Sequence, residues 1–97
     1  MAVLRSFADR ATERLWLRER VPSIDPRVQK SVVKKLRILA AAESLSDLRV
    51  PPGNRLEALQ GDRRGQHSIR VNDQWRICFV WVDGGAENVE LVDYHRG

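Results

Sequence analysis

The sequence predicts an α+β fold in which two N-terminal helices pack on a mainly antiparallel, twisted sheet. Apolar residues recur at helical spacing in the first half of the chain. After Pro51-Pro52-Gly53, apolar and polar residues alternate with period two instead. Turn residues, not further helices, separate the later segments. Helices followed by strands favour helices gathered on one face of an antiparallel sheet. The 97 residues are expected to form a single domain over residues 1–97.

The first segment is expected to be a short edge strand at residues 2–5, followed by a helix. Ser6 is a suitable N-cap for this helix, which we expect to run to about Arg20. Val21-Pro22 ends it, because the residue before a proline avoids the helical region.

The second helix is expected from Asp25-Pro26 to about Glu43, since aspartate caps free N–H groups and proline suits the first helical position. One face is apolar and the opposite face is basic. The apolar face is formed by Val28, Val32, Leu36 and Leu39, and the basic face by Arg27, Lys30, Lys34 and Arg37. The basic face is either a solvated outer surface or an electrostatic footprint for RNA or the ribosome.

After a connection over residues 44–53, four strands are expected near residues 55–60, 66–71, 75–82 and 87–94. A three-residue turn at 72–74 keeps the apolar side chains of the two middle strands on one face. This turn places Arg70 beside Arg76 on the other face.

The turn before the last strand is expected to have four residues, 83–86. This register sets Asp93 opposite Arg76 and points His95 to the same face. Arg70, Arg76, Asp93 and His95 would then converge on one side of the sheet.

Composition excludes several classes of protein. A single cysteine, Cys78, excludes a disulfide scaffold and a cysteine-rich zinc site, and two histidines are too few for a typical catalytic zinc centre. Cys78 is expected to be a small buried residue within a strand. The longest apolar run is too short to span a bilayer, and charged residues interrupt any secretory pattern at the N-terminus. We therefore expect a cytoplasmic protein without metal or cofactor.

The net charge of +4 is unevenly distributed along the chain. Residues 1–50 hold eleven basic and six acidic residues, a net charge of +5, whereas residues 51–97 have a net charge of −1. The excess positive charge is compatible with a polyanionic partner.

The predicted convergent face carries groups suited to phosphate chemistry. Guanidinium groups bind phosphate through planar forks of donors, and a histidine transfers protons near neutral pH. Metal-free RNA cleavage needs a base for the 2′-OH, an acid for the leaving 5′ oxygen and cations for the phosphorane; Glu57, His95 and the arginine pair are candidates. Alternatively, Glu57 and His95 are simply exposed, and Arg76 with Asp93 forms a structural ion pair. Tyr94 is either a core aromatic or a surface for base stacking.

Three segments closely resemble the HigB toxins of the RelE-like superfamily of bacterial toxin–antitoxin systems. They are RLEALQGDRRGQHSIRV at 55–71, QWRICF at 74–79 and VDYH at 92–95, and the helical AAAESL at 40–45 also matches. The resemblance covers nearly the whole chain and implies a fold like that of microbial RNases.

The resemblance also implies an activity and partners. It implies a toxin that enters the ribosomal A site and cuts mRNA there by 2′-OH attack, without metal or cofactor, leaving a cyclic phosphate and a free 5′-OH. It implies a cognate HigA-like antitoxin with a helix-turn-helix domain. The toxin would be linked to operator DNA only through this antitoxin. The alternative is a non-catalytic growth inhibitor that binds the ribosome or another partner and has a degenerate site.

The candidate site differs from many HigB sequences at two positions. Glu57 stands where these toxins carry a histidine, and Gln60 stands where they carry a lysine. The related YoeB branch has glutamate, arginine and histidine at the positions of Glu57, Arg76 and His95. The resemblance therefore implies Glu57 as base, His95 as acid and Arg76 as phosphate ligand. The residues expected to contact substrate are Arg70, Tyr94, Asp93, Gln60 and Arg63.

Overall fold

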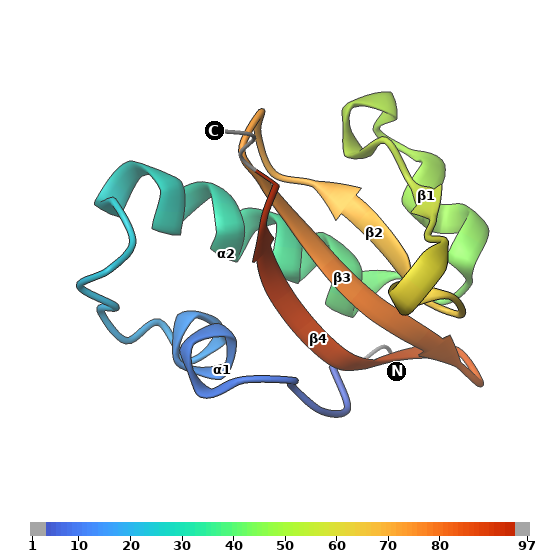
Figure 1. Cartoon of the computed structure of the whole chain (residues 1–97), viewed down its shortest axis with the longest axis horizontal. Coiled ribbons are helices and arrows are strands. Elements are labelled where there is room, and N and C mark those ends of the chain that lie inside the picture. Colours follow the sequence, from blue (N-terminus) through green and yellow to red (C-terminus); the bar gives the residue numbers. More distant parts are fainter. Residues whose placement is uncertain (1–3, 95–97) are drawn as a thin grey trace.

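The computed structural model describes residues 4–94 as two layers, a four-stranded sheet and two helices (Figure 1). The helices are α1 (Arg10–Trp16) and α2 (Pro26–Ala41), and the strands are β1 (Glu57–Ala58), β2 (His67–Arg70), β3 (Trp75–Val82) and β4 (Gly85–Asp93). The strands pair in chain order, and all pairs are antiparallel. The predicted α+β class is confirmed. Within the described residues, no helix combines the length and apolarity needed to cross a membrane.

The N-terminal segment packs along β4 and does not enter α1. Leu4 and Phe7 form isolated parallel bridges with Ala86 and Val89. Ser6, expected as the helix N-cap, instead accepts a hydrogen bond at its Oγ from the backbone of β4. Asp9 is the actual N-cap, and its carboxylate accepts from the Thr12 N–H at 2.7 Å. The expected strand at 2–5 is limited to the Leu4 bridge, and residues 2 and 3 lie outside the described part.

Helix α1 ends at Trp16, four residues before the predicted end. Arg18 adopts a left-handed conformation with φ of 64°. Its N–H donates to the Leu15 carbonyl and the Glu19 N–H donates to the Arg14 carbonyl. This pair of bonds is a Schellman motif, which ends the helix although no glycine is present. Val21-Pro22 therefore follows the helix end and does not cause it.

Helix α2 begins at Asp25-Pro26 as predicted, and the Asp25 carboxylate accepts from the backbone of the first turn. It ends at Ala41, because the Asp47 carboxylate accepts the backbone N–H groups of Glu43 and Ser44 at 3.0 and 3.2 Å. These bonds draw the chain into a short 3₁₀-helix, Leu45–Arg49. The predicted apolar face is confirmed: Val32, Leu36 and Leu39 are buried and Val28 packs against them.

One core fills the space between the helices and the sheet. The sheet contributes Ile69, Ile77, Phe79, Ala86 and Val89, and the helices contribute chiefly Leu15, Val32, Leu36 and Leu39. Figure 1 shows α2 crossing behind the sheet, so that one sheet face is covered by helix. The side chains that alternate with the core residues along each strand point to the opposite face.

The turn between β2 and β3 has the three residues predicted. Ile69 pairs with Ile77, and Arg70 pairs with Arg76. The Asn72 side chain stabilises the turn by accepting the N–H groups of Gln74 and Trp75, both at 2.8 Å. Arg70 and Arg76 therefore lie side by side, as expected.

The turn between β3 and β4 has two residues, not the predicted four. Asp83 and Gly84 have φ of 46° and 77°, as a tight hairpin turn requires, and Val82 pairs with Gly85. A β-bulge then shifts the register between Cys78 and Val80. The shorter turn and the bulge shift the pairing of β3 with β4 in opposite directions. Together they leave residues 75–78 of β3 opposite residues one position away from the predicted partners.

Candidate active site

The candidate site lies on the sheet face that the helices leave uncovered. The register places Glu57 opposite Ser68, Ser68 opposite Cys78, and Cys78 opposite Glu90. Directly opposed residues point to the same face of a sheet, so these four side chains form a row. Arg70 and Arg76 lie opposite each other, two positions along their strands from this row. The register thus places Glu57, Arg70 and Arg76 on one face, and the predicted juxtaposition of Arg70 and Arg76 is confirmed.

Arg76 extends across β2 toward β1. Its Nε donates to the Ser68 Oγ at 2.8 Å, and its Nη2 donates to the Arg55 carbonyl at 2.7 Å. The Nη2 also lies 3.4 Å from the Ser68 carbonyl oxygen. All three acceptors are uncharged, and no carboxylate among residues 4–94 forms a salt bridge with this guanidinium. Arg76 is therefore held in place without a compensating carboxylate among the residues that the structure describes.

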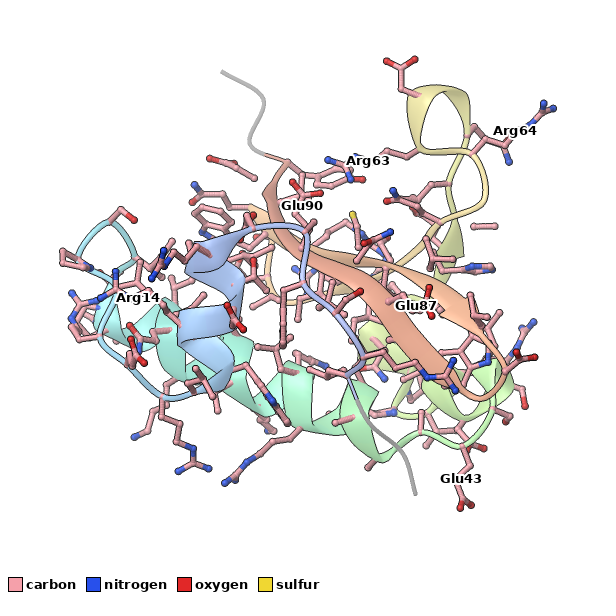
Figure 2. All side chains as sticks on the ribbon, turned by 90° about the horizontal axis from the view of Figure 1, so that it is seen from below. Arg14, Glu43, Arg63, Arg64, Glu87 and Glu90 are labelled. Atoms are coloured by element: carbon pink, nitrogen blue, oxygen red, sulfur yellow. The ribbon has the colours of Figure 1, made fainter. Side chains whose placement is uncertain are left out.

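Arg63 reaches the same face from a loop beyond β1. Its guanidinium donates to the Glu90 carboxylate at 3.0 Å and to Gln66 at 3.1 Å. Figure 2 shows Arg63 directed toward Glu90, whereas its neighbour Arg64 points outward. The hydrogen bond to Glu90 is the main cause of a raised pKa for Arg63. Arg63 is thus charged but already paired.

Arg70 is also paired with a carboxylate. Its guanidinium donates to Asp73, in the turn that follows β2. Arg70 lies opposite Arg76 in the register, but its ion pair draws it toward the end of the strand. Of the three arginines on this face, only Arg76 lacks an acidic partner within the described residues.

Tyr94 follows β4 and packs over the buried Cys78. The tyrosine hydroxyl lies 3.8 Å from the Cys78 Sγ, and about 36% of the residue is exposed. Burial raises the pKa of both groups, and the contact with Cys78 raises that of Tyr94 further. Cys78 is a buried strand residue as expected. Tyr94 has one polar end fixed and part of its ring open to a ligand, so it is suited to stacking.

Glu57 lies at the open edge of this face, and Gln60 follows two residues after β1. Both residues are exposed, and Glu57 is one of the two residues of β1. Glu57 is opposite Ser68, the residue that holds Arg76, so the carboxylate and the guanidinium flank one buried serine. This arrangement brings a potential base and a phosphate ligand to the same patch of surface.

The predicted pairing of Asp93 with Arg76 is wrong. Val92 lies opposite Arg76, and Asp93 lies opposite Trp75. The shorter turn and the bulge cause this one-residue difference, which moves Asp93 to the other face of the strand. The Asp93 carboxylate accepts from the Gln74 side chain at 3.2 Å. His95 lies outside the described residues, so its predicted position on the Arg76 face stays a prediction.

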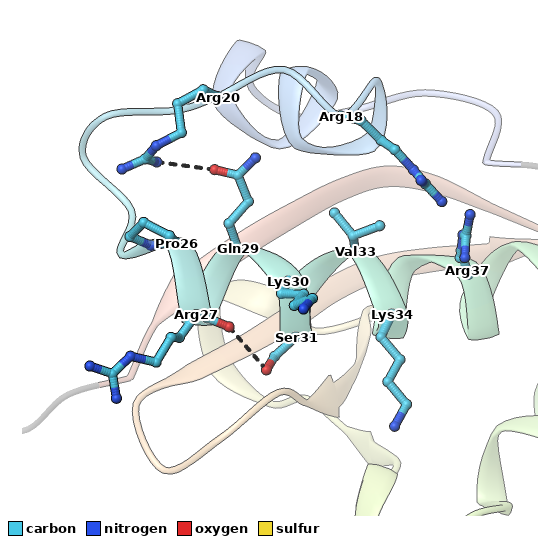
Figure 3. Close-up of a pocket in the computed structure, with 10 residues that line it drawn as sticks. All are labelled: Arg18, Arg20, Pro26, Arg27, Gln29, Lys30, Ser31, Val33, Lys34 and Arg37. Atoms are coloured by element: carbon cyan, nitrogen blue, oxygen red, sulfur yellow. Dashed lines mark hydrogen bonds between the residues drawn. The ribbon is translucent and has the colours of Figure 1, made fainter.

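A basic groove lies elsewhere, between α2 and the connection from α1 (Figure 3). Its basic residues are Arg18, Arg20, Arg27, Lys30, Lys34 and Arg37. The last four are the predicted basic face of α2, and all are exposed. Within residues 4–94 none of the six forms a salt bridge, and Figure 3 shows Arg18 and Arg37 directed toward one another. The groove is a concentrated site of positive potential.

Several residues of these sites were not predicted. Ser68 and Glu90 are buried or half-buried beside Arg76 and Arg63, and Arg18 and Arg20 complete the groove. Alternation along the strands could have placed Ser68 and Arg76 on one face, but not their hydrogen bond. Among the described residues, no three His, Cys, Asp or Glu side chains group as metal ligands.

Comparison with known proteins identifies a family that matches nearly the whole chain. The family of HigB toxins, RelE-like toxins of type II toxin–antitoxin systems, matches residues 5–95. Toxin HigB-1 of Vibrio cholerae serotype O1 is 52% identical over 69 residues, which are 71% of this chain and 72% of that toxin. Endoribonuclease HigB of Proteus vulgaris is 44% identical over 41 residues, 42% of this chain and 45% of that enzyme.

Proposed function

Because the chain belongs to the HigB toxins of type II toxin–antitoxin systems, which have a cognate antitoxin, we propose that it is a ribosome-dependent endoribonuclease. It cuts mRNA in the ribosomal A site and so inhibits translation and growth. The similarity to the endoribonuclease HigB of Proteus vulgaris supports RNA cleavage. The observation that carries the proposal is the Arg76 guanidinium, which has no acidic partner among residues 4–94 and shares a sheet face with Glu57.

The reaction requires one base, one acid and one phosphate ligand. Glu57 removes the 2′-OH proton, and that oxygen attacks the adjacent phosphorus. Arg76 stabilises the additional negative charge of the phosphorane. His95 protonates the departing 5′ oxygen, so the products are a 2′,3′-cyclic phosphate and a free 5′-OH. No metal ion or cofactor takes part in this mechanism.

The neighbouring residues bind the RNA around the scissile bond. Arg63 and Arg70 attract phosphates, although their ion pairs with Glu90 and Asp73 reduce the net charge that they offer. Tyr94 stacks on a base of the mRNA. Gln60 is exposed just after β1 and contacts the substrate by hydrogen bonds, whereas Asp93, on the other face of β4, is not proposed as a substrate ligand.

The basic groove on α2 is the proposed ribosome-binding surface. Phosphate contacts by lysine and arginine supply most sequence-independent affinity for nucleic acid. Arg27, Lys30, Lys34 and Arg37 are exposed without acidic partners in the described chain, which leaves them available to ribosomal RNA. The ribosome places the protein in the cytoplasm. The antitoxin is HigA-like, with a helix-turn-helix domain through which the complex contacts operator DNA.

Cleavage on programmed ribosomes tests the enzymatic proposal. We expect the wild-type protein to cut A-site mRNA, and Glu57→Ala, Arg76→Ala and His95→Gln each to abolish both cutting and growth inhibition. Retained antitoxin binding shows that each variant is folded. If all three variants stay toxic, the site assignment is wrong. Binding to ribosomes without any cut would instead support a non-catalytic inhibitor that acts through the basic groove.

A further inference from the structure

Ser68 occupies the position between the two groups at the centre of the candidate site. It lies opposite Glu57 in the register, and its Oγ accepts the Arg76 Nε–H at 2.8 Å. The residue is completely buried, so its hydroxyl is shielded from solvent, and the hydrogen bond that the structure gives it is the one from Arg76. A buried hydroxyl that receives a bond from an arginine fixes the plane of the guanidinium.

The chemical type of the acceptor distinguishes Arg76 from the other arginines on this face. Arg63 and Arg70 are oriented by carboxylates, which orient a guanidinium but also offset its charge. Arg76 is oriented by the Ser68 hydroxyl and two backbone carbonyls. These neutral dipoles restrict the side chain while its full positive charge remains available to a phosphate.

The bonding pattern also leaves a defined part of the guanidinium open. Its bonds use Nε and Nη2. Within residues 4–94 no hydrogen bond uses Nη1 of Arg76, so that nitrogen is available to a phosphate oxygen. An arginine held on one side and open on the other is preorganised for charge that develops during a reaction.

We propose that Ser68 is a positioning residue, which holds the Arg76 guanidinium toward the scissile phosphate; this rests on the proposed ribonuclease function. Ser68 acts through Arg76 and has no contact of its own with the reacting atoms. Without the hydroxyl, the Nε–H loses its acceptor, and the long side chain regains rotamers that point away from the phosphate. The loss falls on the cleavage step and not on binding to the ribosome.

Single-turnover cleavage at saturating ribosome concentration tests this role. We expect Ser68→Ala to reduce the rate about tenfold, the usual effect of losing one hydrogen bond to a charged group. The matched control is Thr12→Val, which removes another buried hydroxyl, one that accepts from the Leu91 N–H at 2.9 Å. We expect this control to lower stability and to leave the cleavage rate unchanged.

The same substitution in an Arg76→Lys background separates positioning from a structural effect. Coupled residues give non-additive effects, so Ser68→Ala should change the rate of Arg76→Lys by less than about twofold. A full tenfold loss in that background, or a wild-type rate for Ser68→Ala alone, would overturn the proposal.

A measurement on the wild-type protein needs neither activity nor a folded variant. In ¹⁵N NMR, the Nε–H of Arg76 should exchange with water much more slowly than that of the exposed Arg64, because Ser68 accepts its hydrogen bond. Equal exchange rates would overturn the positioning role. If the wild-type protein cuts no mRNA on ribosomes, the ribonuclease proposal fails, and the NMR result still decides whether Ser68 holds Arg76.

Discussion

At the scale of single residues, the burial of Cys78 and Tyr94 is expected to make the stability of the protein sensitive to alkaline pH. Burial is the largest cause of the raised pKa of the Cys78 thiol, and it also raises the pKa of Tyr94. An acid whose pKa is higher in the folded state favours folding while it is protonated. Its contribution is present below the unfolded pKa, about 8.5 for cysteine, and is lost as the pH rises through the folded value.

We therefore expect the free energy of unfolding to fall as the pH is raised above about 8.5. Urea denaturation between neutral pH and pH of about 10 measures this slope. Cys78→Ser retains a hydrogen-bonding group but does not titrate in this range, so its stability should decline less steeply than that of the wild-type protein. Parallel slopes for the two proteins would show that the thiol does not cause the decline.

Among single residues of the candidate site, only some contacts could be predicted from the sequence. The juxtaposition of Arg70 and Arg76 could be predicted, because a three-residue turn was needed to keep apolar side chains on one face. The hydrogen-bond acceptors of Arg76 could not be predicted. An arginine is long enough to cross a neighbouring strand, so Ser68 and the Arg55 carbonyl were as accessible to it as any carboxylate.

At the scale of elements, the types and order of helices and strands follow from the sequence, but several ends do not. Local patterns fix α2 and β3, whose apolar faces are long and regular. Contacts with distant parts of the chain determine where the other helices and strands begin and end. Ser6 has the chemistry of an N-cap but binds β4, and a bulge with Asn88 at φ of 51° moves Asp93 away from Arg76.

The end of α1 provides a test of local strain. Arg18 occupies the left-handed position of a Schellman motif, where glycine is preferred. We expect Arg18→Gly to stabilise the protein by about 1 kcal/mol, as measured by chemical denaturation. Arg18→Ala is the control, because it removes the same charge and keeps the strain. Equal stabilisation by both would attribute the gain to reduced repulsion from Arg37, toward which Arg18 points (Figure 3).

At the scale of the whole molecule, the two proposed functions, ribosome binding and RNA cleavage, lie on two separate surfaces. The helical half carries the excess positive charge, and the structure gathers six of its basic residues in the groove of Figure 3. The sheet carries the candidate chemistry, and two of the arginines on its face, Arg63 and Arg70, are paired with carboxylates. The concentration of charge in the first half was visible in the sequence. The groove was not, because it depends on Arg18 and Arg20 from the connection before α2.

This separation predicts that ribosome affinity and cleavage can be altered independently. Each lysine that contacts a phosphate adds roughly one unit to the slope of log affinity against log salt concentration. Lys30→Gln with Lys34→Gln should therefore weaken ribosome binding and lower that slope by about two, while the single-turnover rate at saturating ribosomes stays near wild type. Filter binding over a range of potassium concentrations measures the slope. The matched control, Arg10→Gln with Arg49→Gln, removes two exposed charges outside the groove and should alter the slope much less. If both pairs lower the slope equally, the protein binds through its overall charge and the groove has no special role.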